Sequence, residues 1–430
     1  MSLLFITIII LLIFILLEAP LFTVIAGLSI VCFYFVDYDP LSIQMILIEM
    51  NRLASMPVLM ALPMFTFTGC LLTESNAPVR IMDFLRAVTG RVPGGMAIAA
   101  VLGCAFFAAL TGASGVTIVA IGGILYPILI KEQYSETFSL GLLTTSGSLG
   151  LLFPPSLPII LYGVVAKINI SEIFMAALIP GILSITVLSF YSFCKDYSFN
   201  KKRGRPVSQE VSHPGIWKAF IAAVWEWPVI VLIVVGIYGG FVTIAEVSAV
   251  IAVYVTIVEC FILKEVRFFR QLPGIIVEGA VLSGAIIVIL SFALGFTGYL
   301  VDEKIPNLIL GYLTGITQNK YVFLCGLNIF LLAVGCIMDI FSAIVIIVPI
   351  IVPVALQYGV DPVHLCIIFL LNLEIGYSTP PVGMNLFIAS LKFQKPVPLL
   401  YRASIPYLLL LFALLLVVTY IPSLSLCLIR

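Results

Sequence analysis

Long apolar runs, separated by short charged or Gly- and Pro-containing segments, extend along almost the whole chain. Such runs predict membrane-crossing helices, since about 20 apolar residues span the hydrocarbon core of a bilayer. The predicted spans lie near residues 2–17, 21–36, 57–73, 95–130, 136–166, 176–194, 228–240, 244–262, 275–300, 320–356, 362–391 and 404–422. The pattern therefore predicts an all-α polytopic membrane protein with about ten crossing helices.

Two of these runs, 95–130 and 320–356, are too long for one span, and each has small or polar residues at its centre. The central residues are TGASG at Thr111–Gly115 and GCIMD at Gly335–Asp339. We predict that each run forms a re-entrant hairpin of two half-membrane helices that meet at a polar tip. Two full crossings would need more apolar residues than each limb offers.

Two other runs contain residues that break helices. Thr144–Pro158 reads TTSGSLGLLFPPSLP, and Leu371–Asn385 reads LNLEIGYSTPPVGMN. Proline removes an amide donor and clashes with the preceding turn, and glycine weakens the helix around it. Open backbone at membrane depth is tolerated only inside the protein or beside a watery cavity. Paired interrupted helices therefore indicate the substrate and ion site of a secondary transporter.

A shift of 226 residues superimposes the two broken helices without a gap. The shift pairs backbone-breaking residues, namely Gly69 with Gly295, Pro127 with Pro353, Gly150 with Gly376, Pro154 with Pro380, Pro155 with Pro381, and Pro180 with Pro406. The chain is therefore predicted to be an internal duplication. Each repeat has an odd number of crossings, so the second repeat is inverted relative to the first.

The distribution of basic residues predicts the orientation. The loops 74–94, 131–135, 195–227, 264–274 and 392–403 hold 16 of the 21 Lys and Arg residues. Basic loops stay on the cytoplasmic side. This places the N- and C-termini outside, and the first hairpin enters from the cytoplasm while the second enters from outside.

Composition supports a membrane protein and excludes several function classes. Hydrophobic residues make up 62% and charged residues 10% of the chain, and the formal net charge is zero, so no nucleic-acid partner is expected. The nine cysteines and two histidines form no metal-ligand pattern, and no P-loop motif is present, so neither a transition metal nor another cofactor is predicted. The N-terminal run lacks a basic leader, and we predict a retained crossing helix rather than a signal peptide.

We predict two cation sites, each formed by a hairpin tip and the adjacent broken helix. Helix ends and unwound carbonyls place partial charges inside the bilayer. The first site is assigned to Thr111, Ser114, Gly147, Gly150 and Pro154, and the second to Gly335, Asp339, Gly376, Ser378 and Pro380. Oxygen ligands without a carboxylate cage suit Na⁺ better than Ca²⁺ or Zn²⁺.

A substrate site is predicted beside the same two breaks, from Ser146, Ser156, Asn372, Thr379 and Asn385. The two asparagines can donate hydrogen bonds to a carboxylate. The alternatives remain open: the hydroxyls can hydrogen-bond to helix backbone, Asn385 can hold the break in shape, and Asp339 can cap the next helix. Glu374, an acid in a membrane span, is either functional or structural.

The stretches GIYGGFVTIAEVSAVIAVY (236–254), LEIGYSTPPVGMNLF (373–387) and the TGASG tip resemble the large membrane subunit of tripartite ATP-independent periplasmic (TRAP) transporters. This resemblance runs along essentially the whole chain. It implies an elevator-type, Na⁺-driven transporter of organic acids, such as C4-dicarboxylates or sialic acid, in the bacterial inner membrane. It also implies two partners, a small four-helix membrane subunit, expected here as a separate chain, and a soluble periplasmic binding protein.

On this interpretation a moving block slides against a scaffold. We expect the block in residues 74–166 and 301–395, and the scaffold in residues 1–73, 167–227 with its cytoplasmic linker, 228–300 and 396–430. One alternative is a stand-alone Na⁺/carboxylate symporter or antiporter of the same fold. A remote one is a rhomboid-like serine protease with Ser114 as nucleophile, which needs a membrane histidine as base.

Overall fold

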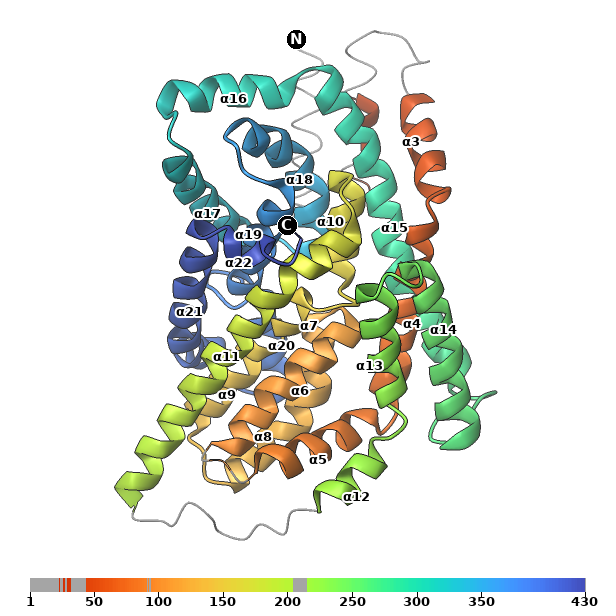
Figure 1. Cartoon of the computed structure of the whole chain (residues 1–430), viewed down its shortest axis with the longest axis vertical. Coiled ribbons are helices and arrows are strands. Elements are labelled where there is room, and N and C mark those ends of the chain that lie inside the picture. The colour runs from red at the N-terminus through yellow and green to blue at the C-terminus, as the bar shows by residue number, and fades with distance from the viewer. Residues whose placement is uncertain are drawn as a thin grey trace.

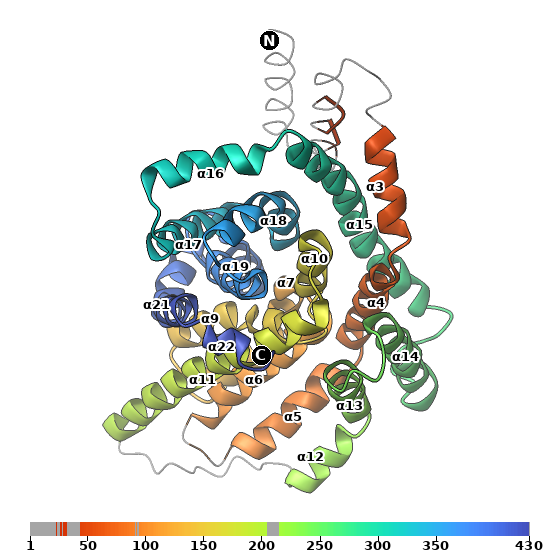
Figure 2. The ribbon, with the colours of Figure 1, turned by 45° about the horizontal axis from the view of Figure 1, so that its top comes forward.

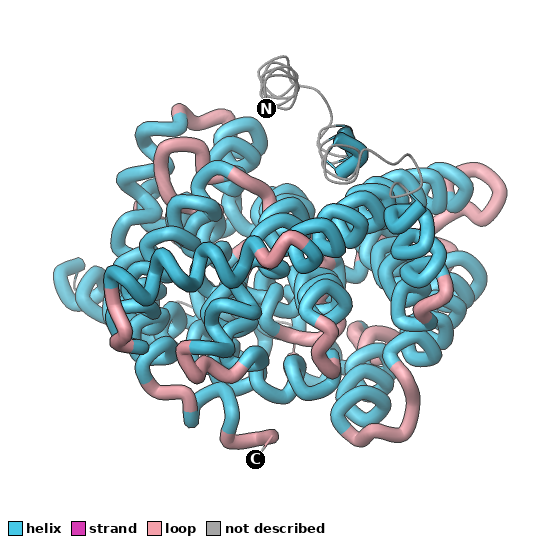
Figure 3. The backbone as a smooth tube through the Cα atoms, turned by 90° about the horizontal axis from the view of Figure 1, so that it is seen from above, coloured by secondary structure: helices cyan, strands magenta, loops and turns pink. Residues whose placement is uncertain are grey.

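The computed structural model describes residues 23, 26–27, 29–31, 44–90, 92, 94–203 and 215–429. These residues form helices and loops without a strand (Figure 3), which confirms the all-α fold class. Within this part of the chain, eight helices are long and apolar enough to cross a membrane, or ten if each of two bent pairs counts as one span. The first two predicted spans, 2–17 and 21–36, lie wholly or largely outside the described residues.

One group of helices lies along one side of the molecule (Figures 1 and 2). Its members pack mainly on one another: α3 (Gln44–Ala54), α4 (Ala61–Glu74), α13 (Trp227–Ile233) with η5 (Val234–Tyr238), α14 (Ile244–Ile257) with η6 (Val258–Ile262), and α15 (Leu272–Asp302). These helices follow the predicted spans 57–73, 228–240, 244–262 and 275–300 within a few residues.

The remaining helices contain both hairpins and both breaks. The first hairpin is α6 (Gly95–Thr111), α7 (Ser114–Thr117), η3 (Ile118–Gly122) and α8 (Gly123–Lys131), and the second is α17 (Lys320–Ile337) and α18 (Ile340–Gln357). The broken helices are α9 (Glu136–Ser146), η4 (Leu149–Leu152) and α10 (Leu157–Ala166), and α19 (Pro362–Gly376) and α20 (Met384–Phe393). Each helix is interrupted at its double proline, and the first break bends the chain by 46°.

The two repeats interlock through the second halves of their broken helices. Helix α10 packs along α18 of the second hairpin, and α20 packs on α7, η3 and α8 of the first. Helix α19 lies at the centre of this group (Figure 2), and every residue from Val363 to Gly376 is buried. A helix that is apolar around its whole circumference needs such burial on all sides.

Two long helices flank this core. Helix α21 (Val397–Tyr420) packs along α9 and α19, and α11 (Ile170–Arg203) packs on α6, η4 and α19. The hydroxyl of Tyr407 in α21 donates to the carbonyl of Phe138 in α9 at 3.0 Å. Both helices therefore pack mainly on the hairpin and break segments.

Four described helices fall between the predicted spans: α3, α5 (Ala77–Thr89), α12 (Ile216–Ala222) and α16 (Ile305–Ile316). The 226-residue shift carries α5 onto α16, and the two lie at opposite ends of the molecule (Figure 1). The first hairpin and α5 share the lower end in this view, whereas the second hairpin and α16 share the upper end. This arrangement confirms two inverted repeats.

Polar contacts and one shared pocket connect the five loops that are rich in Lys and Arg. Tyr134, Lys195 and Arg402, from three of these loops, line the same pocket. Gly94 N donates to Asp196 at 2.7 Å, and Asn76 N donates to Glu265 at 2.7 Å. The side chain of Lys395 contacts Glu136, next to the loop 131–135, at 2.5 Å. The five loops therefore lie on one side of the protein, as the charge pattern predicts.

Candidate functional site

The tip of the first hairpin meets the start of α20. The hydroxyl of Ser114 donates to Oδ1 of Asn385 at 2.7 Å, although the two residues are 271 positions apart. Left-handed glycines position both side chains, because Gly112 (φ 65°) ends α6 just before Ser114 and Gly383 (φ 56°) precedes α20. Both side chains are buried, and Asn385 Nδ2 has no hydrogen-bond partner among the described residues.

The tip of the second hairpin packs on the second break. A Cβ atom added at Gly376 would lie 2.6 Å from the carbonyl carbon of Gly335, so only glycine permits this backbone approach. Gly383 N donates to the carbonyl of Cys336 at 3.1 Å, and the backbone amide of Ile340 contacts the Tyr377 hydroxyl. The same break therefore touches both tips, which enter from opposite ends of the molecule.

The limbs of these hairpins are longer than half-membrane helices. Ser114–Lys131, Lys320–Ile337 and Ile340–Gln357 have 18 residues each, close to a full crossing by length. Their tips nevertheless meet at the same break, through Ser114 to Asn385 and through Cys336 to Gly383. Tips that meet from opposite ends do not reach the far side, so the hairpins are re-entrant.

Asp339 acts as the N-cap of α18. Its Oδ2 accepts from the backbone amides of Phe341 and Ser342 at 3.0 and 3.1 Å, and the Ser342 hydroxyl contacts Oδ1. The carboxylate therefore lies at the positive end of a helix dipole. It is also half-buried, which leaves one face open.

The residues predicted for the first cation site do not all lie together. Thr111 Oγ1 donates to the carbonyl of Phe107 at 3.0 Å. A Cβ at Gly147 would lie 3.4 Å from the carbonyl oxygen of Ser114, so Gly147 lies at the tip. Gly150 instead packs on the backbone of α6, and Pro154 lines a cavity of about 350 Å³ between α5, α6, α11 and α13.

The other predicted polar residues divide into two classes. Some are already engaged: Ser156 caps α10, Thr379 donates to the carbonyl of Ile375 at 2.7 Å, and Asn372 donates to Asn328 at 2.7 Å. Ser146 and Ser378 are buried, and their hydroxyls have no hydrogen-bond partner among the described residues. Pro380 is exposed at the outer edge of the second break.

Three polar residues near this region were not assigned to a site from the sequence. Tyr377 binds the second tip, and Asn328 joins Asn372 to Thr419. Both are polar residues within apolar runs, and that signal could have found them. Both carboxyl oxygens of Glu374 are buried without a hydrogen-bond partner in the described structure.

The arrangement converges helix ends and unwound backbone on one buried region. Amides at the starts of α7 and α20 can stabilise an anion, and the carbonyls that end α6 and α17 can bind a cation, whereas the first amides of α18 are occupied by Asp339 and Tyr377. It does not resemble a serine protease, because His364 contacts Ser425 at 2.6 Å and the carbonyl of Thr419 at 3.3 Å. Ser114 instead bonds to an amide.

Comparisons with known proteins identify a family and several similar chains. Residues 8–424 match the family model described as the DctM component of the tripartite ATP-independent periplasmic transporter. The chain is 34% identical over 391 residues to the C4-dicarboxylate TRAP transporter large permease protein DctM of Pseudomonas aeruginosa, covering 91% of this chain and 90% of that protein.

It is 37% identical over 380 residues to the isethionate TRAP transporter permease protein DctMQ of Oleidesulfovibrio alaskensis. That match covers 87% of this chain, which spans only 58% of the relative. Among solved structures, the YdaH transporter of Alcanivorax borkumensis matches with a TM-score of 0.64 at 13% identity, covering 90% of each chain. This last likeness concerns the fold alone.

Proposed function

Since the chain belongs to the DctM family of tripartite ATP-independent periplasmic transporters, we propose that it is the large membrane subunit of a Na⁺-driven importer of a small organic acid. The observation that carries the proposal is the convergence of both hairpin tips on the second break, through Ser114 with Asn385 and Cys336 with Gly383. Such a region can hold a cation and a carboxylate together.

Membership of the family supports the partners and the class of substrate that we propose. A small membrane subunit and a periplasmic binding protein complete the transporter, and the chain lies in the inner membrane with both termini in the periplasm. The relatives named for C4-dicarboxylate and isethionate carry small organic anions, which favours a small organic anion here.

We further propose an elevator mechanism in which the hairpins and broken helices move as one block. Helices α11 and α21 belong to this block, because they pack mainly on its other members. The proposal thus moves α11 and α21 out of the scaffold, to which residues 167–227 and 396–430 were assigned from the sequence. The cavity beside Pro154 lies between block and scaffold, where sliding takes place.

Charge coupling makes the proposed uptake concentrative. Each net positive charge that moves inward gains about 2.3 kcal/mol per 100 mV of membrane potential. At about 1.4 kcal/mol per tenfold ratio, this gives roughly 50-fold accumulation. A monoanion carried with two Na⁺ supplies one such charge.

Uptake into proteoliposomes tests the proposal. The chain is reconstituted with its small subunit and binding protein, and uptake of a radiolabelled C4-dicarboxylate and of isethionate is measured with and without an inward Na⁺ gradient. Uptake should require both the gradient and the binding protein. Equal uptake without the gradient would overturn Na⁺ coupling, and equal uptake without the binding protein would favour a stand-alone symporter.

A further inference from the structure

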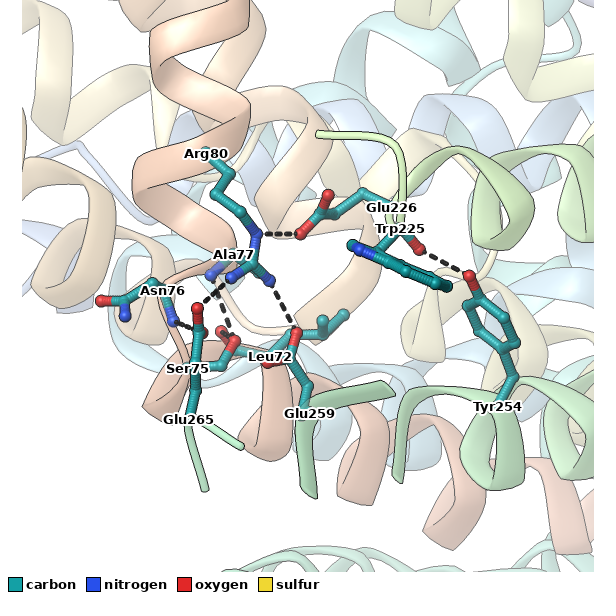
Figure 4. Close-up of polar contacts among 10 residues, drawn as sticks. All are labelled: Leu72, Ser75, Asn76, Ala77, Arg80, Trp225, Glu226, Tyr254, Glu259 and Glu265. Atoms are coloured by element: carbon teal, nitrogen blue, oxygen red, sulfur yellow. Dashed lines mark hydrogen bonds and ion pairs between the residues drawn. The ribbon is translucent and has the colours of Figure 1, made fainter. Parts of the chain in front are cut away.

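One guanidinium group holds α5 to three other segments (Figure 4). Arg80 Nε contacts Glu226 at 2.6 Å, one terminal nitrogen contacts Glu259 at 2.8 Å, and the other contacts Glu265 at 2.5 Å. Glu226 precedes α13, Glu259 lies in η6, and Glu265 lies in the loop after η6. We call these four residues the Arg80 cluster. It joins α5, which packs on the hairpin helix α6, to the scaffold helices.

The carboxylate oxygens of the cluster are not all satisfied. One oxygen of each Glu binds Arg80, and the second oxygen of Glu265 accepts from Asn76 N at 2.7 Å. The second oxygens of Glu226 and Glu259 are buried without a hydrogen-bond partner among the described residues. These side chains are only 6% and 2% exposed.

The charges do not balance either, because three carboxylates surround one guanidinium. The titratable neighbours Tyr254 and Cys260 bring no positive charge, and the Tyr254 hydroxyl donates to the carbonyl of Trp225 at 3.0 Å (Figure 4). Further along α5, Asp83 pairs with Arg86 at 3.5 Å, and Lys264 in the adjoining loop is exposed. Among the described groups facing Glu226 and Glu259, Arg80 is the one cation.

Burying a carboxylate without a partner costs several kcal/mol, so the two free oxygens need a positive counterpart. A metal ion would be repelled by the guanidinium at the centre of the cluster. A proton needs no coordination shell and turns a free acceptor into a neutral hydroxyl. We propose that the Arg80 cluster binds one proton, on Glu226 or Glu259, and that this proton fastens α5 to the scaffold.

Electrostatics give the direction of the pH dependence. Glu226 lies in the turn between α12 and α13, and burial raises the pKa of its carboxyl against the opposing effect of Arg80. A raised pKa means that the assembled cluster holds the proton more tightly than an open, hydrated one. The attachment is therefore complete at low pH and weakens as the pH rises through the raised pKa.

Helix α16, the counterpart of α5 in the second repeat, lacks this cluster. The 226-residue shift places Pro306 of α16 where α5 has Arg80. The fold of the repeat therefore does not require the Arg80 cluster. The cluster can act only on the predicted cytoplasmic side.

Two measurements on the full chain in lipid nanodiscs test the proposal. Hydrogen exchange, corrected for the intrinsic rate, should show protection factors of α5 falling by up to about tenfold per pH unit as the pH rises from the ordinary carboxyl pKa to the raised one, and levelling off above it. Infrared spectra should show a protonated carboxyl band that declines over the same range. In the double variant Glu226→Gln/Glu259→Gln, the protection factors of α5 should no longer depend on pH. The pH-dependent part of the protonated carboxyl band should also be absent.

Two further variants make the test specific. Glu136→Gln, which removes the exposed pair with Lys395, should behave as the wild type. Glu265→Gln should shift the transition to lower pH, because it removes a negative charge from the cluster and leaves both proton acceptors. The proposal is overturned if wild-type protection does not change with pH, if Glu265→Gln causes no shift, or if Na⁺ rather than pH controls protection.

Discussion

At the scale of single residues, the contact between Ser114 and Asn385 is the most informative feature of the site. Ser114→Ala and Asn385→Ala should each weaken the apparent Na⁺ affinity of uptake by about three- to tenfold, since a lost hydrogen bond costs about 0.5–1.5 kcal/mol. The double variant should lose less than the sum of the two, because both substitutions remove one interaction. Uptake titrated against Na⁺ measures this.

Thr186→Ala is the matched control for these variants. Thr186 is exposed on α11 and donates to the carbonyl of Ile182 at 2.7 Å, so its loss removes a similar bond far from the tips. It should leave the Na⁺ titration unchanged. Strictly additive losses at Ser114 and Asn385 would mean that their contact is not part of ion binding.

Asp339 offers a test between helix capping and ion binding. Asp339→Asn keeps a capping oxygen for α18, whereas Asp339→Ala removes it and should cost about 1 kcal/mol of stability. If the carboxylate binds Na⁺, both variants should weaken Na⁺-dependent uptake although only the alanine lowers the thermal midpoint. Normal Na⁺ dependence of uptake in Asp339→Asn would mean that Asp339 only caps α18 and does not bind Na⁺.

The residue scale also marks the limit of inference from sequence. Ser114 and Asn385 are both recognisable as polar residues within apolar runs, but they were assigned to different sites. Their contact depends on how two repeats pack together, and no local pattern contains that information. The cap at Asp339, by contrast, is a local feature and was one of the predicted alternatives.

At the scale of elements, the prolines and glycines that break helices allowed the interrupted helices and the repeat to be predicted from the sequence. Both double prolines interrupt their helices, and the 226-residue shift maps the first hairpin and break onto the second. Helices α5 and α16 were missed for a physical reason. Arg80, Asp83 and Arg86 interrupt the apolar pattern of α5, and α16 has only 12 residues, too short for the span criterion.

Gly376 tests the packing of tip on break. Gly376→Ala places a Cβ 2.6 Å from the backbone of Gly335, where no side chain can yield, so we expect a loss of about 1–3 kcal/mol. The control is Gly326→Ala, in α17 like Gly335. A Cβ at Gly326 would have nothing within 4 Å, so this variant should be neutral or stabilising. Thermal midpoints of the detergent-solubilised proteins compare them, and an unchanged midpoint in Gly376→Ala would contradict the close approach.

At the scale of the whole molecule, the inverted repeats predict the two faces of the membrane. Lys167 and Gln394 end α10 and α20, both are exposed, and both adopt left-handed backbone conformations (φ 58° and 52°). On a cysteine-free background, Lys167→Cys should react with a membrane-impermeant maleimide in cells with a permeable outer membrane. Gln394→Cys should react only after the inner membrane is opened, and labelling of both in closed cells would contradict the inversion.

The interlocked packing of α10 on α18 and of α20 on the first hairpin also constrains how the protein is made. When ribosomal synthesis has completed the first repeat, α10 can pack only on α11, η4 and α4, and the segments of the first hairpin that contact α20 are still uncovered. The contacts of α10 with α18 and of α20 with the first hairpin can form only after the second repeat has been inserted. Neither repeat can therefore complete the packing of its hairpin and broken helix without the other.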